Sequence, residues 1–482
     1  MASRPGGVHC STKADGNPLQ ESQVIQTNKL HPAAIAVWWL DDARRFLVAL
    51  LAIVIARGGN ALVIVSAGAV VLTVFEVLRY LRFTYRIEGN TLIVEGGLLN
   101  RFRRSLPFAR IQSVDVVQKL RHRLFGVVEL RIETAGGSST EAPLVALTPK
   151  EAESLRPMLL GEDAAAPAGP QPPALVKLTP GDLIVAAFTG GRVAVVAVIF
   201  GYAQEVLGDE LLESLASQAE DALRSAFLVT VLAVLGVVAL VLTASVVATT
   251  LVYWNFTVRR QGARLIVERG LLERRRATVP LRRVQAVQVR ENPLRRIFRK
   301  AALTSITAGY SPSNEEREET SMLLPIGSRD QALWLAGLAL DLPAPPDRPL
   351  EGAPRGALLR RLVEALLFVA AVTTVALVLL GPRGLWSLLL LLPLAGMAWL
   401  SYRALGFRLD SDYLAVQSGV FNRRTTIIPR SNVQHLALSR GPVQRAFDLA
   451  SLKIGVPKAK PHAHDLARST AEATMTELYG TS

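Results

Sequence analysis

The chain has 482 residues, half of them hydrophobic, and a formal net charge of +14. Apolar membrane spans beside arginine-rich segments reconcile these two properties, which are hard to combine in a soluble protein. The single cysteine, Cys10, excludes an internal disulfide and a cysteine metal cluster. The sequence has no phosphate loop, dinucleotide-binding glycine motif, zinc-peptidase motif or serine-hydrolase elbow. We therefore expect a membrane protein that is not an enzyme and carries no cofactor.

The first 43 residues are polar and lack the apolar core of a cleavable signal peptide, so we expect a disordered or interfacial lead. Three apolar hairpins are predicted after it, over residues 44–82, 181–252 and 358–402. The arm at 61–81 is long enough to cross a bilayer, at about 1.5 Å per residue. The arm before it is cleanly apolar only over 46–56, and Arg192 in the second hairpin is expected at the membrane surface.

Short apolar runs that alternate with charges predict three small β domains, over residues 83–160, 253–342 and 403–482. Each ends in a helix pattern with a capping box, formed by Thr148 and Glu151, Ser328 and Gln331, or Ser469 and Glu472. The proline-rich segments 161–180 and 343–357 are predicted linkers. The segments between paired spans carry few bases, which predicts that the domains and both termini are cytoplasmic.

The three domains share one pattern without gaps, in which glycine precedes proline by about ten residues and glutamine follows it by about five. The copies are LIVEGGLLNRFRRSLPFARIQ, LIVERGLLERRRATVPLRRVQ and LAVQSGVFNRRTTIIPRSNVQ. The fold residues of this repeat are Gly97, Pro107, Gln112, Gly270, Pro280, Gln285, Gly419, Pro429 and Gln434. We expect positive φ at the glycines, a strand edge or bulge at the prolines, and backbone hydrogen bonds at the glutamines. Phenylalanine recurs at positions 125, 298 and 447, where we expect core residues.

The repeat resembles the bacterial pleckstrin-homology-like (PH-like) domain family of membrane proteins, on the pattern of strand, glycine, arginine, strand, proline and glutamine. The resemblance covers nearly the whole chain as a member with three domains and six spans. It implies an α+β membrane protein in which each PH-like domain is a bent antiparallel sheet closed by a C-terminal helix, beside three transmembrane hairpins. It implies little about activity, because the biochemical role of the family is poorly defined.

Arginines are the variable part of the repeat, dense in the second copy and thin in the third. The candidate binding residues are Arg274, Arg275, Arg276, Arg282, Arg283, Arg295 and Arg296. Solubility and membrane topology explain much of this charge; anionic lipid headgroups and a protein partner, including a companion PH-like membrane protein, are the alternatives. Nucleic acid is disfavoured because aromatic residues do not alternate with the bases. No metal is expected, because His462, His464 and Asp465 fall short of a closed site.

These observations predict a non-enzymatic scaffold or binding module at the inner face of the cell membrane, with envelope maintenance or stress resistance as the expected process. A transporter is the alternative, and it needs a water path through polar residues such as Thr189, Thr230 or Ser245. The oligomeric state and the ligand are left open by the sequence.

Overall fold

The computed structural model describes residues 27–43, 46, 61–98, 100–134, 143–160, 172–190, 220–307, 322–457 and 460–479. These form two compact units, Met1–Ala109 and Arg110–Ser482, which we describe separately. The first arms of the first two predicted hairpins, Arg192, the acidic loop of the second hairpin and the acidic insertion near 311–321 lie outside the described residues.

The first unit is built on a four-stranded antiparallel sheet with the order β1-β2-β3-β4. Its elements are β1 (Thr27–Asn28), α2 (Ala61–Arg82), β2 (Thr84–Glu88), β3 (Thr91–Gly96) and β4 (Phe102–Pro107). Where α2 meets β2, the Phe83 ring packs edge-on against Trp38, with 5.9 Å between ring centroids. The Tyr80 hydroxyl donates to the Leu30 carbonyl at 3.1 Å. These contacts hold the segment before the first apolar hairpin against the end of α2.

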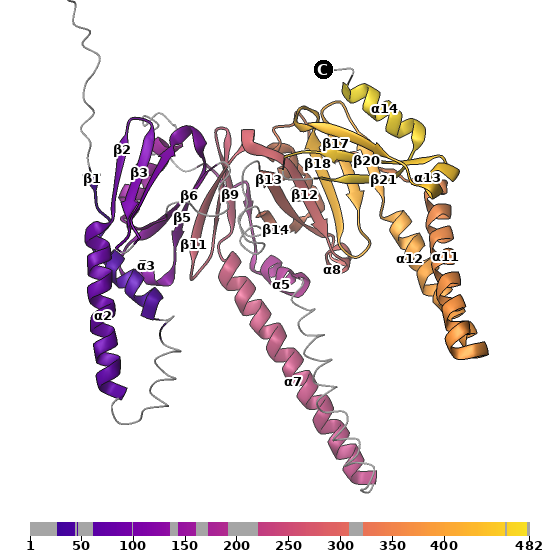
Figure 1. Ribbon diagram of the computed structural model, residues 1–482, viewed down its shortest axis with the longest axis horizontal. Helices are drawn as coiled ribbons and strands as arrows, with labels where there is room; N and C mark the ends of the chain where they lie inside the picture. The colour runs from indigo at the N-terminus through magenta and orange to yellow at the C-terminus, as the bar shows by residue number, and fades with distance from the viewer. Residues whose placement is uncertain are drawn as a thin grey trace, which may run out of the picture. The chain divides into compact units, whose positions relative to one another are not determined.

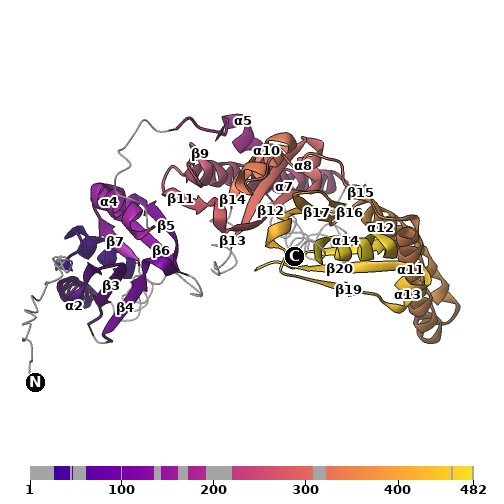
Figure 2. The same ribbon diagram turned by 90° about the horizontal axis from the view of Figure 1, so that it is seen from above.

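The second unit contains two seven-stranded antiparallel sheets and a three-stranded one (Figures 1 and 2). Their strand orders are β7-β6-β5-β11-β10-β9-β8, β14-β13-β12-β18-β17-β16-β15 and β19-β20-β21. Each seven-stranded sheet joins the last three strands of one repeat to the first four strands of the next repeat. The three predicted domains therefore share their sheets, which the sequence analysis did not anticipate.

The three repeats follow one order of elements. The first supplies η2 (Phe108–Arg110), β5 (Ile111–Gln118), α3 (Leu120–Leu124), β6 (Val128–Thr134), β7 (Leu144–Leu147) and α4 (Pro149–Leu159). The second supplies β8 (Val176–Lys177), α5 (Pro180–Thr189), α7 (Glu220–Tyr253), β9 (Thr257–Gln261), β10 (Arg264–Arg269), β11 (Arg274–Pro280), η3 (Leu281–Arg283), β12 (Val284–Glu291), α8 (Pro293–Ile297), β13 (Lys300–Thr307), β14 (Met322–Ser328) and α10 (Arg329–Ala339). The third supplies β15 (Glu351–Gly352), α11 (Arg355–Leu380), η4 (Gly381–Leu390), α12 (Leu391–Arg403), β16 (Gly406–Leu409), β17 (Tyr413–Ser418), β18 (Arg423–Pro429), η5 (Arg430–Asn432), β19 (His435–Ser439), α13 (Pro442–Ala446), β20 (Leu449–Gly455), β21 (His462–Ala467) and α14 (Arg468–Tyr479).

Both junctions between repeats use the same register. At the first junction β11 pairs with β5, and Arg276 lies opposite Val116. At the second junction β18 pairs with β12, and Thr425 lies opposite Val289. Arg276 and Thr425 each stand four residues before the proline of their own repeat, and Val116 and Val289 each stand nine residues after the proline of the preceding one. The junction is therefore a repeated structural unit of the protein.

The two predicted linkers contain strands, so their assignment as linkers is wrong at their C-terminal ends. Val176 pairs with Val258 of β9, and Glu351 pairs with Phe407 of β16. In the first repeat Thr27 likewise pairs with Arg86. These strands were not predicted from the sequence, because a strand of two residues is too short to show the alternation of apolar and polar residues. The apolar helices are thus insertions between the first and second strands of each repeat.

The turn that recurs in each repeat depends on glycine, and the expected positive φ is confirmed. The φ angles of Gly97, Gly270 and Gly419 are 95°, 103° and 94°. A Cβ atom on Gly270 would stand 1.9 Å from the Glu273 carbonyl oxygen, so no other residue fits without a shift of the backbone. This turn joins β10 to β11 and fixes where the arginines of β11 begin.

The proline and the glutamine mark the bend between the two halves of a repeat. Pro280 and Pro429 end their strands, beyond the residues that pair with the neighbouring repeat, so the missing N–H donor costs no ladder bond there. The strands that follow change register at Gln112 and Gln285, which each occupy a β-bulge. Gln434 donates its backbone N–H to Gly455 at 2.9 Å.

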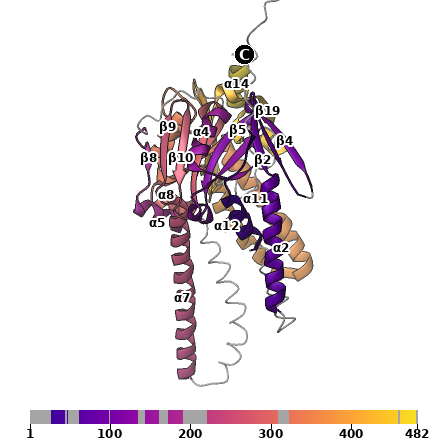
Figure 3. The ribbon, with the colours of Figure 1, turned by 90° about the vertical axis from the view of Figure 1, so that its left-hand side faces the viewer.

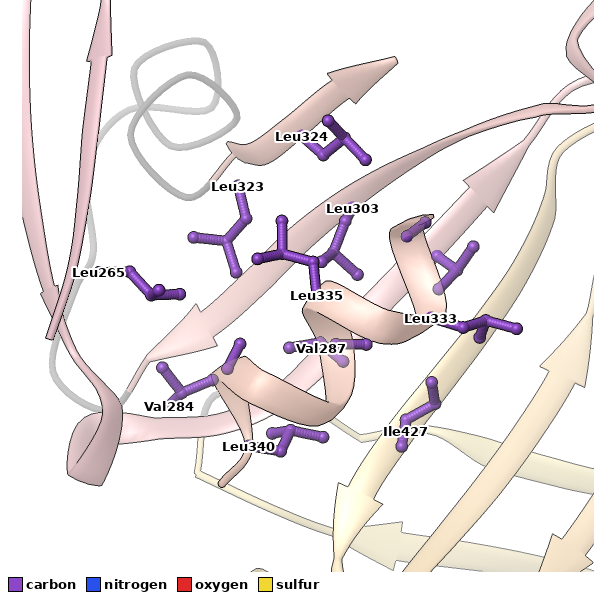
Figure 4. Packing of buried hydrophobic residues seen from close by; sticks show 14 of the residues in the cluster. Leu265, Val284, Val287, Leu303, Leu323, Leu324, Leu333, Leu335, Leu340 and Ile427 are labelled. Atoms are coloured by element: carbon purple, nitrogen blue, oxygen red, sulfur yellow. The ribbon is translucent and has the colours of Figure 1, made fainter. Parts of the chain in front are cut away.

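Helix α10 closes the core of the second repeat (Figure 4). Leu335 and Leu340 pack with Val287 and Leu303 of the sheet, and Ile427 of the third repeat joins the same cluster. The capping boxes predicted at Thr148 and Ser328 are formed. The one predicted at Ser469 is wrong, because α14 begins at Arg468 and Ser469 lies inside the helix.

The prediction that Phe125 and Phe298 pack in the core is also wrong. They are 40% and 53% exposed, because each follows a short helix that projects from the sheet between two strands. The buried leucines of the pattern are instead Leu130, Leu303 and Leu452, all fully enclosed.

Two stretches among the described residues are long and apolar enough to cross a membrane, Leu235–Tyr253 and Arg355–Arg403. The second stretch folds back on itself, and Gly384 approaches the α11 backbone at Leu377 closely enough that a Cβ atom would clash. In the second unit α7, α11 and α12 extend from the same side of the sheets (Figures 1 and 3). Their apolar side chains are largely exposed, as expected of helices that contact lipid.

We predict that Gly270→Ala destabilises the folded chain by about 1–3 kcal/mol, the cost of holding a non-glycine residue in a strained conformation. Thermal unfolding of the detergent-solubilised full chain measures the change. Gly352→Ala is the control, because a Cβ at Gly352 meets nothing within 4 Å. Equal melting temperatures for both variants would contradict the role assigned to this turn.

Candidate functional site

A cavity of about 440 Å³ lies at the first junction, where β11 of the second repeat pairs with β5 of the first. Its lining comes from both repeats: Val116, Gln118, Val128, Pro149, Glu153, Arg156, Trp254, Asn255, Glu268, Arg269, Gly270, Arg274, Arg275 and Arg276. Five of these residues are arginines and two are glutamates. We call this the arginine cavity.

The glycine turn fixes the arginine cavity to the end of α7. The Gly270 N–H donates to the Trp254 carbonyl, and the Leu271 N–H donates to the Leu251 carbonyl, both at 2.9 Å. Trp254 is 44% exposed, and tryptophan at the end of an apolar helix is typical of a membrane–water boundary. The cavity is therefore next to the point where α7 leaves the sheets.

Strand β11 brings three consecutive arginines to the cavity, and two of them are held by carboxylates. Arg275 pairs with Glu273 at 2.8 Å. Arg276 pairs with Glu268 at 3.2 Å and with Glu153 of α4 at 3.6 Å. Such pairs fix the guanidinium groups in place without removing their remaining N–H donors, since each guanidinium carries five.

A buried polar cluster of Arg156, Thr278 and Asp115 supports the cavity from behind. Arg156 of α4 donates to the Thr278 hydroxyl of β11, so that the closing helix of the first repeat binds the second repeat. Burial and the neighbouring charge of Arg276 lower the pKa of Arg156 to about 10. Burial raises the pKa of Asp115 to about 6, against the opposing effects of the Thr278 N–H and of Arg156. Both shifts arise mainly from burial, which disfavours the charged form of each group.

The Nε atom of Arg156 is buried and has no hydrogen-bond partner among the described residues. A buried donor without a partner costs free energy, and an acceptor entering the cavity offers it one. Because a bound anion would also offset the repulsion between Arg156 and Arg276, the site is suited to a compact anion such as a phosphate group.

The candidate arginines do not form one cluster. Arg274, Arg275 and Arg276 line the cavity, whereas Arg282 and Arg283 lie in η3, at the far end of β11. Arg295 and Arg296 lie in α8, in the second half of the repeat. Arg295 donates to the hydroxyl of Thr189, at the end of α5, at 3.4 Å. Helices α5 and α8 lie side by side in Figures 1 and 3.

An arginine from the short helix of one repeat binds the glycine turn of the next. Arg123 of α3 donates to the Leu271 carbonyl at 2.9 Å, and Arg296 of α8 donates to the Val420 carbonyl at 3.0 Å. Both arginines stand two residues before the recurrent phenylalanine, and both acceptors directly follow the glycine. Arg296 therefore serves the second junction and is not part of the arginine cavity.

The same short helices expose apolar side chains. Leu124 of α3 and Ile297 of α8 are 75% and 73% exposed, and both follow arginines in the chain. Exposed apolar residues flanked by bases are typical of segments that contact a membrane surface. Helix α8 lies on the side of the second unit from which α7 extends (Figure 1).

The second junction does not reproduce the polar cluster. At the positions that correspond to Asp115, Arg156 and Thr278, the next repeat has Gln288, Ala336 and Ile427. Ile427 and Ala336 belong to the hydrophobic core there, and the residue corresponding to Arg276 is Thr425, which donates to Gln417 at 3.2 Å. The two junctions therefore share one backbone arrangement but differ in charge, because the side chains at the corresponding positions differ.

The histidine cluster of the third repeat is structural. Asp465 is fully buried and pairs with Arg360 at 2.9 Å and with Arg361 at 3.1 Å, both from α11. His462 and His464 stack on each other, with 5.7 Å between ring centroids. No group of three or more potential metal ligands occurs among the described residues. The Asp465 carboxylate thus ties α11 to β21.

Three shared-sheet repeats with apolar helices inserted after their first strands define a membrane protein built on PH-like domains. A family model described as bacterial PH domain matches residues 35–162, 224–333 and 364–480, and the chain belongs to this family. Over 421 residues the chain is 25% identical to the UPF0699 transmembrane protein YdbT of Bacillus subtilis (strain 168). The aligned region covers 81% of this chain and 83% of that protein. No solved structure matches the chain.

Sequence reasoning missed Arg156, Asp115 and Arg269, which complete the site. They lie far from Arg274 in the chain or on a different strand, and only the shared sheet brings them together. Asp115 did carry a local signal, because it is the one charged residue in the apolar strand IQSVDVVQ. A charge within such a strand indicates a buried partner.

Asp115 gives the first junction a predictable pH dependence. Its carboxyl has a pKa of about 6 in the folded chain and about 3.9 when unfolded, so the folded state binds the proton more tightly. Its contribution to stability is therefore present below about pH 4 and is lost as the pH rises through about 6. We expect Asp115→Asn to gain thermal stability relative to the wild type as the pH is raised from 5 to 7.5.

The measurement is the melting temperature of the solubilised full chain at each pH. Asp330→Asn, at an exposed aspartate in the first turn of α10, is the control. Melting curves for wild type and Asp115→Asn that shift in parallel with pH would show that Asp115 does not titrate in this range.

Proposed function

We propose that this protein is a non-enzymatic membrane scaffold with six spans, whose three PH-like domains lie at the inner face of the cell membrane. We further propose that the arginine cavity binds the headgroup of an anionic phospholipid. The observation that carries the second part is the set of five arginines lining a cavity beside the end of α7.

The chemistry of the cavity suits a phosphodiester. Guanidinium groups bind phosphate oxygens through paired, charge-assisted hydrogen bonds. Arg275 and Arg276 are already oriented by Glu273 and Glu268, which lowers the entropic cost of binding. The cavity volume of about 440 Å³ falls in the range of small-molecule sites, roughly 300–1,000 Å³.

The position of the cavity supports a lipid as the source of that phosphate. Trp254, at the end of α7, lines the cavity, and a headgroup would reach it from the membrane surface that α7 enters. Each arginine near an anionic membrane surface contributes about 1 kcal/mol of attraction. The exposed apolar residues of α3 and α8 add a contact with the acyl boundary.

The proposed orientation follows from charge. The connection between α11 and α12 carries one base, Arg383, whereas the β segments on the other side carry many. The excess of lysine and arginine marks the cytoplasmic side. An even number of spans between successive domains would keep all three domains on that side.

The transporter alternative receives little support from the polar residues that would have lined a path. The Ser245 hydroxyl donates to the Ala187 carbonyl at 3.3 Å, and the Thr189 hydroxyl donates to the Val185 carbonyl at 2.7 Å. The Ser245 hydroxyl therefore joins α7 to α5, and the Thr189 hydroxyl bonds within α5. The Thr230 side chain lies outside the described residues. A scaffold that holds a protein partner, in envelope maintenance or stress resistance, is the wider role we assign to the chain.

We predict that Arg274→Gln/Arg276→Gln weakens the binding of short-chain phosphatidylglycerol by roughly thirtyfold, since two bases are lost at about 1 kcal/mol each. Binding is measured by titrating dihexanoylphosphatidylglycerol into the full chain in a neutral detergent. Affinity should fall steeply as salt is raised, because the attraction is electrostatic.

Arg282→Gln/Arg283→Gln is the matched control, with the same change of charge on the same strand-and-turn segment but outside the cavity. Dihexanoylphosphatidylcholine tests the need for net negative charge, and inorganic phosphate separates a lipid headgroup from a free anion as the ligand. Equal losses of lipid affinity in both double variants would show that the effect depends only on net charge, and would refute the arginine cavity as the binding site.

A further inference from the structure

The apolar stretch of α7 reaches the sheets without a spacer. The stretch Leu235–Tyr253 is long and apolar enough to cross a membrane, and Tyr253 is the last residue of the helix. At that end, the carbonyls of Leu251 and Trp254 accept the N–H groups of the glycine turn between β10 and β11. A helix that crosses the membrane over this stretch therefore leaves the sheets of the second repeat at the membrane surface.

Helix α5 is attached at both ends, and the two attachments lie at different levels. Near its N-terminus, Asp182 pairs with Lys300 at the start of β13, at 2.7 Å. Near its C-terminus, the Ala187 carbonyl accepts from the Ser245 hydroxyl of α7 at 3.3 Å. Ser245 lies eight residues before Tyr253. At 1.5 Å per residue this is about 12 Å along α7, so α5 runs from the sheet towards the middle of the apolar stretch.

That distance carries the end of α5 past the lipid headgroups. The polar region on each side of a bilayer is about 5–8 Å thick, half the difference between the full thickness and the hydrocarbon core. An attachment about 12 Å from the surface end of α7 lies deeper than this, even where the helix is tilted by about 20°.

Helix α5 has the two faces that such a position requires. Leu183, Ala186 and Ala187 are buried, whereas Ile184 and Phe188 are 48% and 41% exposed. Ile184 and Phe188 are four residues apart, so they lie on one side of the helix. The large side chains on the exposed side of α5 are therefore apolar.

Helix α8 supplies hydrogen-bond donors to the C-terminal end of α5. The side-chain amide of Asn292 donates to the Thr189 carbonyl, and Arg295 donates to the Thr189 hydroxyl. A helix end surrounded by lipid needs donors of this kind for its last carbonyls, because water is absent there. Since α5 and α8 lie side by side, the contact places α8 at the level that the end of α5 reaches (Figures 1 and 3).

The tip of α8 is the most exposed apolar part of this surface. Leu294, Ile297 and Phe298 are 41%, 73% and 53% exposed. Arg296 binds the adjoining glycine turn of the third repeat, in which Phe421 is 63% exposed. We call these apolar side chains the rim patch; its members are Ile184, Phe188, Leu294, Ile297, Phe298 and Phe421.

The fold does not require an exposed apolar tip on this helix. In the third repeat α13 takes the place of α8, and Ala446 stands where the second repeat has Ile297. Gln444 takes the place of Arg295, and it donates to the buried Asp465 at 2.8 Å. The same short helix therefore forms without a large apolar tip, so Ile297 has a role other than folding.

We propose that α5 and the tip of α8 are embedded in the leaflet next to the sheets, and that the rim patch binds its acyl chains. Lipid is the occupant because the patch is continuous with α7, whose apolar side chains face lipid, through the contact of Ala187 with Ser245. Arg299, exposed at the base of α8, is long enough to place its guanidinium among the phosphates. The inference rests on the membrane position in the proposed function, and not on headgroup binding in the arginine cavity.

Fluorescence quenching in proteoliposomes tests the depth of these side chains. In a Cys10→Ser background, the full chain carries Ile297→Cys or Phe188→Cys, labelled with nitrobenzoxadiazole, in vesicles of phosphatidylethanolamine and phosphatidylglycerol. Both labels should be quenched by phosphatidylcholine with a doxyl group near the top of its acyl chain, and shielded from aqueous iodide. We expect both to lie about 5–10 Å below the membrane surface.

Two further labels calibrate the measurement. Leu240→Cys, within the apolar stretch of α7 and 68% exposed, marks a position inside the membrane. Ala263→Cys, exposed at the opposite end of β10 from the glycine turn, marks the aqueous side. Each labelled chain should unfold at the temperature of the Cys10→Ser chain, which shows that the label reports the folded state.

Three outcomes are decisive. Labels at Ile297 and Phe188 that behave like the label at Ala263 would overturn the proposal, because they would place the rim patch in water. Shielding of both labels from both quenchers would also overturn it, since protein would then cover the patch. A label at Leu240 that the lipid quencher does not reach would show that α7 does not cross the membrane, and the proposed membrane position would fail as well. Lipid titration reads the arginine cavity separately, so headgroup binding and embedding fail independently.

Discussion

The pairing of a strand from one repeat with a strand from the next is the interaction on which the rest of the structure depends. Strand β11 is rich in arginine, yet it lies in the middle of a seven-stranded sheet between β10 and β5. Its backbone groups are satisfied on both sides, while its long side chains extend past the sheet and keep their charged ends near water. The repeats are consequently not independently folded domains, since each shares its sheets and part of its core with its neighbours.

The shared sheet also decides where a binding site can form. At the first junction, an arginine from the closing helix of one repeat lines a cavity with four arginines from the next, and the interior there holds Asp115 and Thr278. At the second junction the same positions hold Ile427 and Ala336, which pack in the core. The same strand pairing therefore supports a charged cavity at one junction and a hydrophobic contact at the other, because backbone hydrogen bonds form with either set of side chains.

The insertion of the apolar helices after the first strand ties each domain to its membrane segment at two points. Strands β8 and β15 precede the inserted helices, and β9 and β16 follow them. In the third repeat, Asp465 adds an ion pair with two arginines of α11. A domain held this way cannot swing freely on one linker, so its basic face and its exposed apolar turns keep their position relative to the helices that enter the bilayer.

The sequence by itself determined the repeat, the membership of the family and the local devices of the fold. The positive φ of Gly270 and the caps at Thr148 and Ser328 follow from a few neighbouring residues, and these were predicted. The exposure of Phe298, the strands within the linkers and the partners of Arg274 were decided only by the tertiary structure. The reason is that they depend on which repeat a strand pairs with. Backbone hydrogen bonds between strands carry no signature of their partner in the sequence, so the arginine cavity, assembled from Arg156 and Arg276 across two repeats, becomes visible only when the shared sheet is seen.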